Sequence, residues 1–376
     1  MRKLKLLCLS AVFSMMFAGM LGAAWTSKRL TFNTDNYSPA IAGDGANVYV
    51  VWENGSVSDN DEIYFRRSAD NGTTWQSAKR LTNNTGYSEV PAIAVSGANV
   101  FVVWEDDTPG NNEIYFSRST DNGATWRAEQ NLTGNTGSSD EPAIAANGEK
   151  VYVAWHDDLP GNEEVYFRRS IDGGATWKIA KRLSNNSGSS SYVGIAVQAA
   201  NIYVVWRDET PGNREIYFRK SADGGVNWEN AKRLTNTAAE SYYPVVAAEG
   251  TNVYVAWYEV LSNDREIYFS KSTDNGATWE SAQRLTNNVG DSFRPVLASS
   301  GPNIYLAWYD YTPGDEEIYF RKSIDRGANW QGIKRLTNDA GYSEFPAIAV
   351  NATNVYVAWC DYKSGYGEIY VKYSPL

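Results

Sequence analysis

The sequence predicts an all-β fold, a seven-bladed β-propeller of four-stranded antiparallel blades. Three observations predict it: a 51-residue unit recurs seven times, each unit holds four strand-like segments, and the two chain ends carry complementary parts of one unit. A tandem period of about 50 residues is typical of propeller blades. The repeat is clearest at the tyrosine of the segment Glu-Ile-Tyr-Phe, which falls at Tyr64, Tyr115, Tyr166, Tyr217, Tyr268, Tyr319 and Tyr370.

Each unit reads as four short strands separated by turns. Residues 91–95 are apolar and 47–52 are β-branched and aromatic, residues 62–68 alternate in polarity, and the polar segment 78–82 suits an outer strand. The links between them are rich in Gly, Asn, Asp and Pro, which favour turns. A solenoid would need atypical polar units at its ends. The end units here match the middle ones, so we expect a closed ring.

The chain ends predict how the ring closes. The propeller sequence begins with an outer-strand segment, residues 27–31, and stops just after a third-strand segment, residues 368–374. The last blade therefore lacks a fourth strand of its own. Pairing these two segments completes that blade and removes two exposed sheet edges.

The N-terminus has the pattern of a secretory signal peptide. Basic residues at 2–5 precede an apolar run at 6–21 that ends in small residues. We expect cleavage near Ala24, which divides the chain into a leader at 1–24 and a propeller at 25–376. The run is short for a membrane span. The protein is therefore expected to be secreted, extracellular or periplasmic, and not inserted in a membrane after cleavage.

Charge and composition narrow the function classes. The formal net charge is -10, and removal of the three basic leader residues leaves 31 basic against 44 acidic side chains. An acidic surface argues against nucleic acids as partners. One histidine, His156, and one cysteine beyond the leader, Cys360, leave no zinc spacing and no intramolecular disulfide. We expect no cofactor and no metal, and a monomer as the state in solution.

The motif Ser-x-Asp-x-Gly-x-Thr-Trp at residues 68–75 occurs six times between the third and fourth strands, with Asn227 and Asn329 in place of Thr in two copies. Ser68 and Asp70 can bond amides within the turn, Gly72 suits a positive φ, and Trp75 is expected to pack on its own sheet. Sixfold recurrence favours a structural role over catalysis. The seventh link is the chain break, so no seventh copy is expected. The other aspartates of this motif are Asp121, Asp172, Asp223, Asp274 and Asp325.

At these residues the chain resembles the Asp-box, or BNR-repeat, proteins of the sialidase-like superfamily. The resemblance covers the propeller sequence as a repeat and implies that the boxes lie on the face opposite the active site. Sialidases have six blades, three arginines that grip a carboxylate, and a Tyr nucleophile with a Glu partner. The nearest match to their Arg-x-Pro sequence is Arg294 directly before Pro295. In the other units this position holds Ser38, Val90, Glu141, Val193, Tyr243 and Phe345.

Two acidic positions recur in the loops of the top face, which is the face of the ring opposite the Asp boxes. One lies two residues after the second-strand Trp, as at Asp310, and the other directly precedes Ile-Tyr or Val-Tyr, as at Glu62. A ring of carboxylates for calcium or polar ligands is one interpretation. The other is that the carboxylates brace each hairpin and pair with fourth-strand Lys or Arg. Sevenfold recurrence favours bracing.

The position directly after the second-strand Trp varies strongly, and it holds Glu53, Glu105, His156, Arg207, Tyr258, Tyr309 and Cys360. Blades four to six gather arginine, tyrosine and carboxylate, which suits an acidic sugar. Drift among surface loops is the alternative. The candidate ligand-binding residues are His156, Arg207, Arg214, Tyr242, Tyr258, Glu259, Arg265, Arg294, Tyr309 and Asp310.

These observations predict a non-catalytic propeller that binds a glycan or an extracellular protein on its top face. A purely structural or adhesive protein differs only in its partner. The enzymatic alternative is a sialidase-like exo-glycoside hydrolase using Tyr258, Glu259 and Arg294. Tyr258 and Glu259 are neighbours on a strand end and should point to opposite faces, which weakens that alternative.

Overall fold

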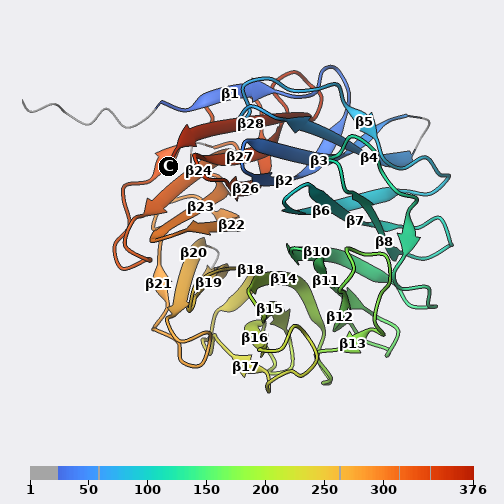
Figure 1. Cartoon of the computed structure of the whole chain (residues 1–376). Coiled ribbons are helices and arrows are strands. Elements are labelled where there is room, and N and C mark those ends of the chain that lie inside the picture. The colour runs from blue at the N-terminus through green and yellow to red at the C-terminus, as the bar shows by residue number, and fades with distance from the viewer. Residues whose placement is uncertain (1–23, 58–59, 262–263, 313, 339) are drawn as a thin grey trace, which may run out of the picture.

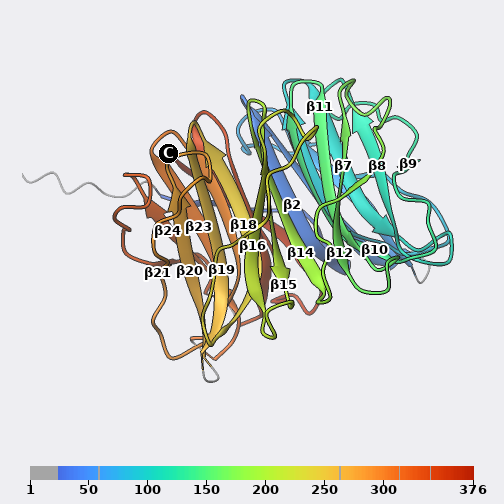
Figure 2. The ribbon, with the colours of Figure 1, turned by 90° about the horizontal axis from the view of Figure 1, so that it is seen from below.

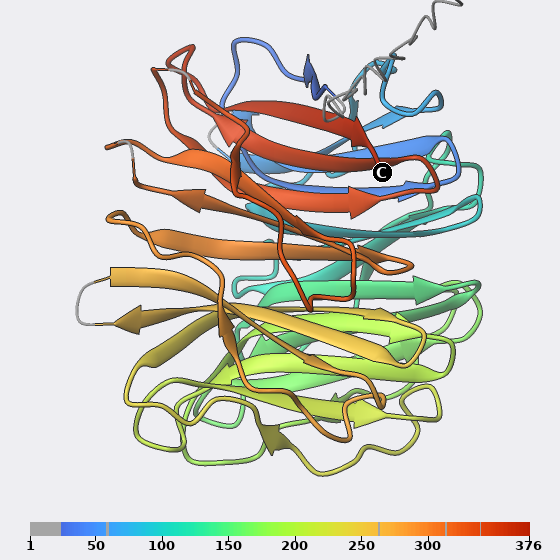
Figure 3. The ribbon, with the colours of Figure 1, turned by 90° about the vertical axis from the view of Figure 1, so that its left-hand side faces the viewer.

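The computed structural model describes residues 24–57, 60–261, 264–312, 314–338 and 340–376, which form seven four-stranded sheets around one axis (Figure 1). Figures 2 and 3 show the ring edge-on, with strands running between its two faces. The innermost strands are β2 (Asn36–Asp44), β6 (Ser88–Ser96), β10 (Ser139–Asn147), β14 (Ser190–Gln198), β18 (Glu240–Glu249), β22 (Ser292–Ser300) and β26 (Ser343–Val350). The second strands are β3 (Asn47–Val57), β7 (Asn99–Asp106), β11 (Lys150–Asp157), β15 (Asn201–Asp208), β19 (Asn252–Leu261), β23 (Asn303–Asp310) and β27 (Asn354–Asp361).

Two further strands complete each sheet on the outside. The third strands are β4 (Asn60–Ser68), β8 (Glu113–Ser119), β12 (Glu164–Ser170), β16 (Glu215–Ser221), β20 (Asp264–Ser272), β24 (Glu317–Ser323) and β28 (Glu368–Pro375). The outermost strands are β5 (Lys79–Arg80), β9 (Gln130–Asn131), β13 (Lys181–Arg182), β17 (Lys232–Arg233), β21 (Gln283–Arg284), β25 (Lys334–Arg335) and β1 (Thr26–Arg29). Blades are numbered 1 to 7 from the one that begins with β2. The predicted fold is therefore confirmed.

The core lies between blades, and the second strands supply most of it. Along β3, Val48, Val50 and Trp52 face blade 7, whereas Tyr49 and Val51 face blade 2. All five are at most 1% exposed. The two-residue side-chain period of a strand allows both faces to be buried in this way. Each such side chain stabilises the ring by about 1.5–3 kcal/mol through burial.

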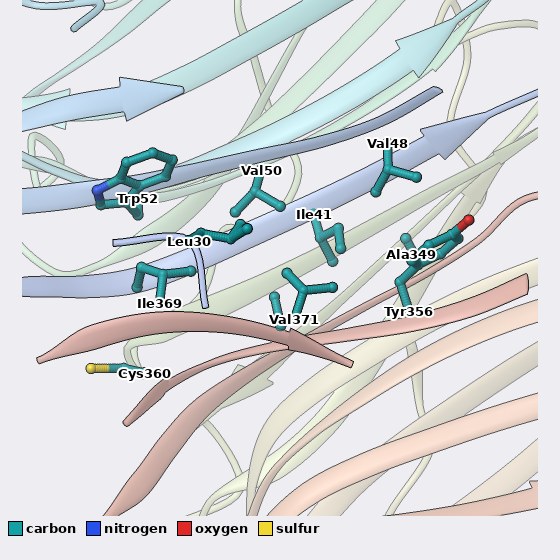
Figure 4. Packing of buried hydrophobic residues seen from close by; sticks show 11 residues of the cluster. Leu30, Ile41, Val48, Val50, Trp52, Ala349, Tyr356, Cys360, Ile369 and Val371 are labelled. Carbon is teal, nitrogen blue, oxygen red and sulfur yellow. The ribbon is translucent and has the colours of Figure 1, made fainter. Parts of the chain in front are cut away.

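The ring closes through the N-terminal strand, as the sequence predicted. β1 pairs antiparallel with β28, and the two lie side by side in Figure 1. The Leu30 amide donates to the Ile369 carbonyl at 2.7 Å. Leu30, Ile369 and Val371 then pack with Val50 and Trp52 of blade 1 (Figure 4). The two ends of the chain therefore share one hydrophobic cluster.

The expected leader at residues 1–24 falls, except for Ala24, outside the described residues, so it stays a prediction. Among the residues that the structure describes, no helix is long and apolar enough to cross a membrane.

The Asp box is a closed hydrogen-bonded turn. Ser68 Oγ donates to Asp70 Oδ1 at 2.7 Å and accepts from the Gly72 amide at 2.9 Å. The Thr74 hydroxyl and amide donate to the same carboxylate at 2.6 and 2.8 Å. These bonds, that of the Thr74 hydroxyl foremost, lower the pKa of Asp70 to about 2. The other five boxes form the corresponding Ser–Asp, Ser–Gly and Asp bonds at Asp121, Asp172, Asp223, Asp274 and Asp325.

Each box also joins neighbouring blades, which the sequence did not indicate. The Trp126 ring meets Phe65 of the preceding blade edge-on, with 5.0 Å between the ring centroids, and packs on a cluster that both sheets supply, so a box Trp does not pack on its own sheet alone. Gly123 has a φ of 82°, and a Cβ there would lie 2.4 Å from the Phe65 ring. Glycine is therefore required both by backbone conformation and by the close approach of that ring.

The interface between blades 6 and 7 has no box, and Trp25 takes the place of the missing box Trp. Its ring meets Phe320 edge-on at 4.9 Å, the contact that Trp126 makes with Phe65. Trp25 directly precedes β1, the fourth strand of blade 7. A tryptophan therefore lies at the interface between blades 6 and 7 as well, although the rest of the box is absent there.

Candidate functional site

The two faces of the ring are distinguished by the strand register. In blade 2, Ser88 pairs with Asp106, which pairs with Glu113, so the innermost strand begins on the same face as the link between the second and third strands. The third strand ends at Ser119, where the box begins on the opposite face. We call the face without boxes the top face.

Every innermost strand is interrupted near its start on the top face. In blade 3 the pairing shifts between Asp140 and Ala143, which leaves Glu141 and Pro142 in a bulge. A bulge with proline needs no ladder hydrogen bond at that point. The bulged residue has a positive φ, between 43° and 57°, in all seven blades. These residues, which we call the mouth, are Ser38, Val90, Glu141, Tyr192, Tyr243, Arg294 and Phe345.

The fourth mouth residue corrects the sequence analysis, which placed Val193 there. Val193 occupies the position that proline holds in the other six blades, and Tyr192 precedes it with a φ of 57°. Blade 4 has no proline to align on, so the register predicted for it is wrong by one residue.

The mouth surrounds a cavity of about 500 Å³ on the axis. Its lining consists of the seven mouth residues and the two residues that follow each in most blades, chiefly proline, valine and alanine. A second space of about 330 Å³ is lined by Ala, Ile, Val, Leu, Pro and Gly of the same strands. Polar chemistry on the axis is therefore concentrated at the mouth.

Among the described residues, Arg294 is the only cationic side chain that lines this cavity. Its Nη2 donates to the Tyr243 hydroxyl at 2.9 Å, and its guanidinium lies 4.5 Å from the Tyr243 ring centroid and 4.7 Å from that of Phe345. No ion pair joins it to a carboxylate among the described residues. Aromatic contacts thus orient the guanidinium while its charge stays uncompensated at short range.

Tyrosines continue from Arg294 around blades 5 and 4. The Tyr192 and Tyr243 rings are 4.2 Å apart, and Tyr258 stacks on Tyr243 at 5.9 Å and on Tyr242 at 5.2 Å. Burial raises the pKa of Tyr192 and of Tyr258 well above that of free tyrosine. Both phenols therefore stay protonated at neutral pH.

Carboxylates dominate the opposite half, in blades 1 to 3. Glu53 accepts the Val90 amide at 2.6 Å, and Glu105 accepts the Glu141 amide at 2.8 Å, so each braces the bulge of the next blade. Burial raises the pKa of Glu53, that of Glu105 to about 8 and that of Glu141 to about 7. These carboxyl groups hold protons at a pH where ordinary glutamates do not.

The lone histidine lies in the same half. His156 pairs with Asp140 across two strands and is 7% exposed. Its Nδ1 has no hydrogen-bond partner among the described residues, and burial lowers its pKa. His156 is therefore neutral at pH 7.

Three predicted arginines are held by polar partners outside the mouth. Arg207 Nη2 donates to Ser191 Oγ at 2.8 Å. Arg214 donates from Nε to Glu209 at 2.8 Å and from Nη1 to Glu240 at 3.1 Å and to Tyr242 at 2.8 Å, and Arg265 pairs with Asp291 at 2.6 Å. Arg207 also lies 4.5 Å from the Tyr192 ring centroid, so it supports the mouth from behind.

The remaining candidates support the blade structure. Glu259 accepts from Trp257 Nε1 at 3.0 Å and Asp310 from Trp308 Nε1 at 3.1 Å, both buried. Tyr309 stacks on Phe293 at 5.1 Å. The Glu259 carboxylate thus points to its own tryptophan, away from the tyrosine cluster around Tyr258.

The second acidic ring braces the hairpins, the interpretation that the sequence favoured. Glu62 pairs with Arg80 of the fourth strand, and Glu368 pairs with Arg29 at 2.6 Å. The same pair recurs in blades 3 to 6. In the described part of the chain, no group of three or more His, Cys, Asp or Glu side chains is arranged to hold a metal ion.

Of the ten predicted ligand-binding residues, only Arg294 lines the mouth. Glu141, Tyr243 and Phe345 were recognised in the sequence as equivalents of Arg294 but were not among the candidates. The signal was present, since these residues directly precede a first-strand proline. Tyr192 lacks that proline, so only the structure identifies it.

The fold and the boxes define a seven-bladed Asp-box propeller. Residues 46–255, more than half of the chain, match the BNR repeat-like domain, and the chain belongs to this family. The xyloglucanase Xgh74A of Acetivibrio thermocellus is 25% identical over 203 residues, which are 44% of this chain and 22% of that protein. The chain thus aligns with less than a quarter of that relative's length.

Solved structures share the fold at low identity. A PL25 ulvan lyase gives a TM-score of 0.63 at 11% identity, covering 92% of this chain and 95% of that one. The phage phi92 endosialidase gives 0.57 at 11%, covering 94% and 69%. The Hadza microbial sialidase Hz136 gives 0.53 at 15%, covering 88% and 76%. At these identities the likeness concerns the fold alone.

Proposed function

We propose that this protein is a secreted, monomeric, glycan-active propeller that takes an anionic sugar into the mouth, with the sugar carboxylate on Arg294. The observation that carries the proposal is the state of Arg294. It lines the cavity, two aromatic rings hold it in place, and no described carboxylate neutralises it at short range.

The surroundings of Arg294 suit a sugar acid. A guanidinium can bind a carboxylate through two parallel hydrogen bonds. The rings of Tyr243 and Phe345 offer apolar faces beside it, Tyr243 adds a hydroxyl, and Tyr192 lines the same cavity, as aromatic residues do in sugar sites. A volume of about 500 Å³ lies in the usual range for small-ligand pockets, roughly 300–1,000 Å³.

The relatives support a glycan as the ligand class. Their names include a xyloglucanase, an endosialidase, a sialidase and a polysaccharide lyase, and one lyase structure holds a glucuronate-containing disaccharide. All of these are enzymes that act on glycans. They favour an active enzyme over the purely binding protein that the sequence suggested.

A sialidase-like site built on Tyr258 and Glu259 is not what the side chains support. The Glu259 carboxylate is engaged by Trp257, and Tyr258 is only 7% exposed among other aromatic rings. Of the arginines predicted in blades 4 to 6, only Arg294 faces the cavity. The proposed protein is therefore still glycan-active, but its proposed site is the mouth and not Tyr258 and Glu259.

Calorimetric titration tests the proposal with three ligand types: 1,4-linked oligouronates, sialyllactose and neutral xyloglucan oligosaccharides. We expect an anionic ligand to bind and the neutral ones not to bind. Arg294→Gln should weaken binding about 30- to 100-fold, the loss of roughly 2–3 kcal/mol from a charge-assisted pair. Arg214→Gln is the matched control, because Glu209 and Glu240 already occupy that guanidinium. Equal binding of charged and neutral sugars would contradict the proposal.

A further inference from the structure

Of the residues that the structure describes, Glu141 is the only carboxylate that lines the mouth cavity. It belongs to blade 3 and Arg294 to blade 6, three of seven steps around the ring, so the two face each other across the axis. Its amide is anchored on Glu105 Oε2 at 2.8 Å, and its backbone holds a φ of 50°. A carboxylate residue with a positive φ that lines a cavity opposite a cation is a candidate functional position.

The charged surroundings of Glu141 make it a group that exchanges protons near neutrality. Burial is the main cause of its raised pKa of about 7. Arg294 and Arg207 favour its charged form, whereas Asp140 and Glu163 oppose it. A general base works best when its pKa lies near the working pH.

The rest of the lining limits the chemistry. Apart from Glu141 and Arg294 it holds serine, proline, valine, alanine, tyrosine and phenylalanine. Glycoside hydrolysis ordinarily uses a pair of carboxyl groups about 5–9.5 Å apart, and the mouth has no second one. Eliminative cleavage beside a carboxylate needs one base, one cation on that carboxylate and one proton donor. The mouth supplies these as Glu141, Arg294 and a tyrosine.

We propose that Glu141 is the catalytic base of a β-elimination that cleaves a 4-linked uronate chain whose carboxylate is bound by Arg294. This proposal rests on the proposed function, because it places the sugar acid in the same mouth. It adds the substrate class, polyuronate, and the reaction.

The reaction balances without a cofactor. The Glu141 carboxylate takes the proton from C5, the carbon that bears the sugar carboxylate, while Arg294 stabilises the charge that moves onto the carboxylate. The electron pair of the C5–H bond forms the C4=C5 double bond. The C4–O4 bond then breaks, and the leaving oxygen keeps its electron pair and takes a proton. Glu141 afterwards releases its proton to water.

Tyr192 is the proton donor for the leaving oxygen. It belongs to blade 4, next to Glu141, and lines the same cavity. Burial and its hydrogen bond with Tyr243 keep its pKa above that of free tyrosine, so it carries its proton at neutral pH. A sugar alkoxide is more basic still and accepts it. Solvent then returns a proton to Tyr192.

The experiment incubates full-length protein with oligogalacturonate and oligoglucuronate. It follows the ultraviolet absorbance of the C4=C5 product and the product masses, which sum to the substrate mass without added water. We expect Glu141→Gln to lower the rate at least about 100-fold, with affinity unchanged within about threefold by titration. The wild-type rate should rise with pH through about 7, and this limb should be missing in the variant. Glu229→Gln, a half-exposed glutamate that follows a box tryptophan and pairs with Lys220, is the control that keeps the wild-type rate.

The outcomes separate this inference from the proposed function. If Glu141→Gln carried out the elimination at the wild-type rate, Glu141 would not be the base. Products that have gained water would show hydrolysis and would also overturn its role. Binding that depends on Arg294 without turnover of either uronate overturns the elimination and leaves the proposed function standing. Failure of every anionic sugar to bind overturns both.

Discussion

The rim of the bottom face, which the six Asp boxes form, and the mouth both repeat a backbone with positive φ, but only this rim repeats its side chains. In the rim, Gly123 and its equivalents have a positive φ, and the same Ser–Asp bonds close every box. In the mouth, bulky residues such as Val90, Tyr243 and Phe345 adopt the positive φ, and no two neighbouring blades present the same chemistry except at the two tyrosines. A conformation that is strained for such residues is expected where function requires it. The boxes, where backbone and side chains both repeat, thus belong to the scaffold. The mouth, where only the backbone repeats, is the candidate site.

The largest expected effect comes from the rim. Gly123→Ala places a Cβ 2.4 Å from the Phe65 ring at a φ of 82° and should lower the free energy of unfolding by about 2–4 kcal/mol. Gly97→Ala is the matched control, because its φ of 60° is similar but nothing lies within 4 Å. It should lose only about 1 kcal/mol. Denaturant unfolding measures both. Equal losses would show that the contact between blades does not determine the need for glycine.

The scaffold was largely predictable because the sequence repeats it. A spacing of 51 residues fixes the number of blades, and the position of residues 27–31 relative to 368–374 fixes how the ring closes. Contacts between blades were not predictable in the same way. The meeting of Trp126 with Phe65, or of Trp25 with Phe320, depends on how neighbouring sheets stack and not on spacing within a unit.

The candidate site overlaps only in part with the residues predicted from the sequence. Arg294, singled out by the proline that follows it, lines the cavity, whereas Arg214 is engaged by carboxylates that a sequence does not reveal. Glu141 was not chosen, since its significance depends on burial and on facing Arg294 across the axis. Val193 was named in place of Tyr192 because blade 4 has valine where the other blades have proline.

Trp25 tests whether the contact between a tryptophan and the preceding blade is needed at the interface that has no box. Trp25→Ala removes the edge-on contact with Phe320 and leaves a space between blades 6 and 7. Because the ring is only half-buried, we expect a loss of about 2 kcal/mol, less than for a fully buried tryptophan. Thermal unfolding measures it beside Trp126→Ala, whose loss should be similar. A value near zero for Trp25 alone would mean that β1 seals the ring without it.

The stability contributed by the carboxyl groups around the mouth and by those of the Asp boxes should change with pH in opposite directions. Glu105 has a pKa of about 8 in the folded protein because it is buried. The stability that its proton brings is fully present below about 4.5, the ordinary value, and is lost as pH rises through about 8. Asp70, with a pKa of about 2, contributes stability above its ordinary value, and this is lost only as pH falls through about 2.

Glu105→Gln should flatten the alkaline side of the stability profile. A single proton changes the free energy of unfolding by at most about 1.4 kcal/mol per pH unit. Between about pH 5 and about pH 8, thermal unfolding should show a smaller fall in the free energy of unfolding in the variant than in the wild type. Glu209→Gln should leave the decline unchanged. An unaltered slope in Glu105→Gln would assign the decline to other carboxyl groups.

The smallest effect tests whether the mouth can lose chemistry without losing stability. Tyr243→Phe removes the hydroxyl that accepts from Arg294 and keeps the ring beneath the guanidinium. One hydrogen bond is worth about 1 kcal/mol, so affinity for the anionic sugar should fall about fivefold, with unfolding unchanged within about 0.5 kcal/mol. Titration and thermal unfolding of the same sample measure the two quantities. If stability fell and affinity did not, the hydroxyl would serve the scaffold, and the distinction between a repeated backbone and a variable site would fail at this residue.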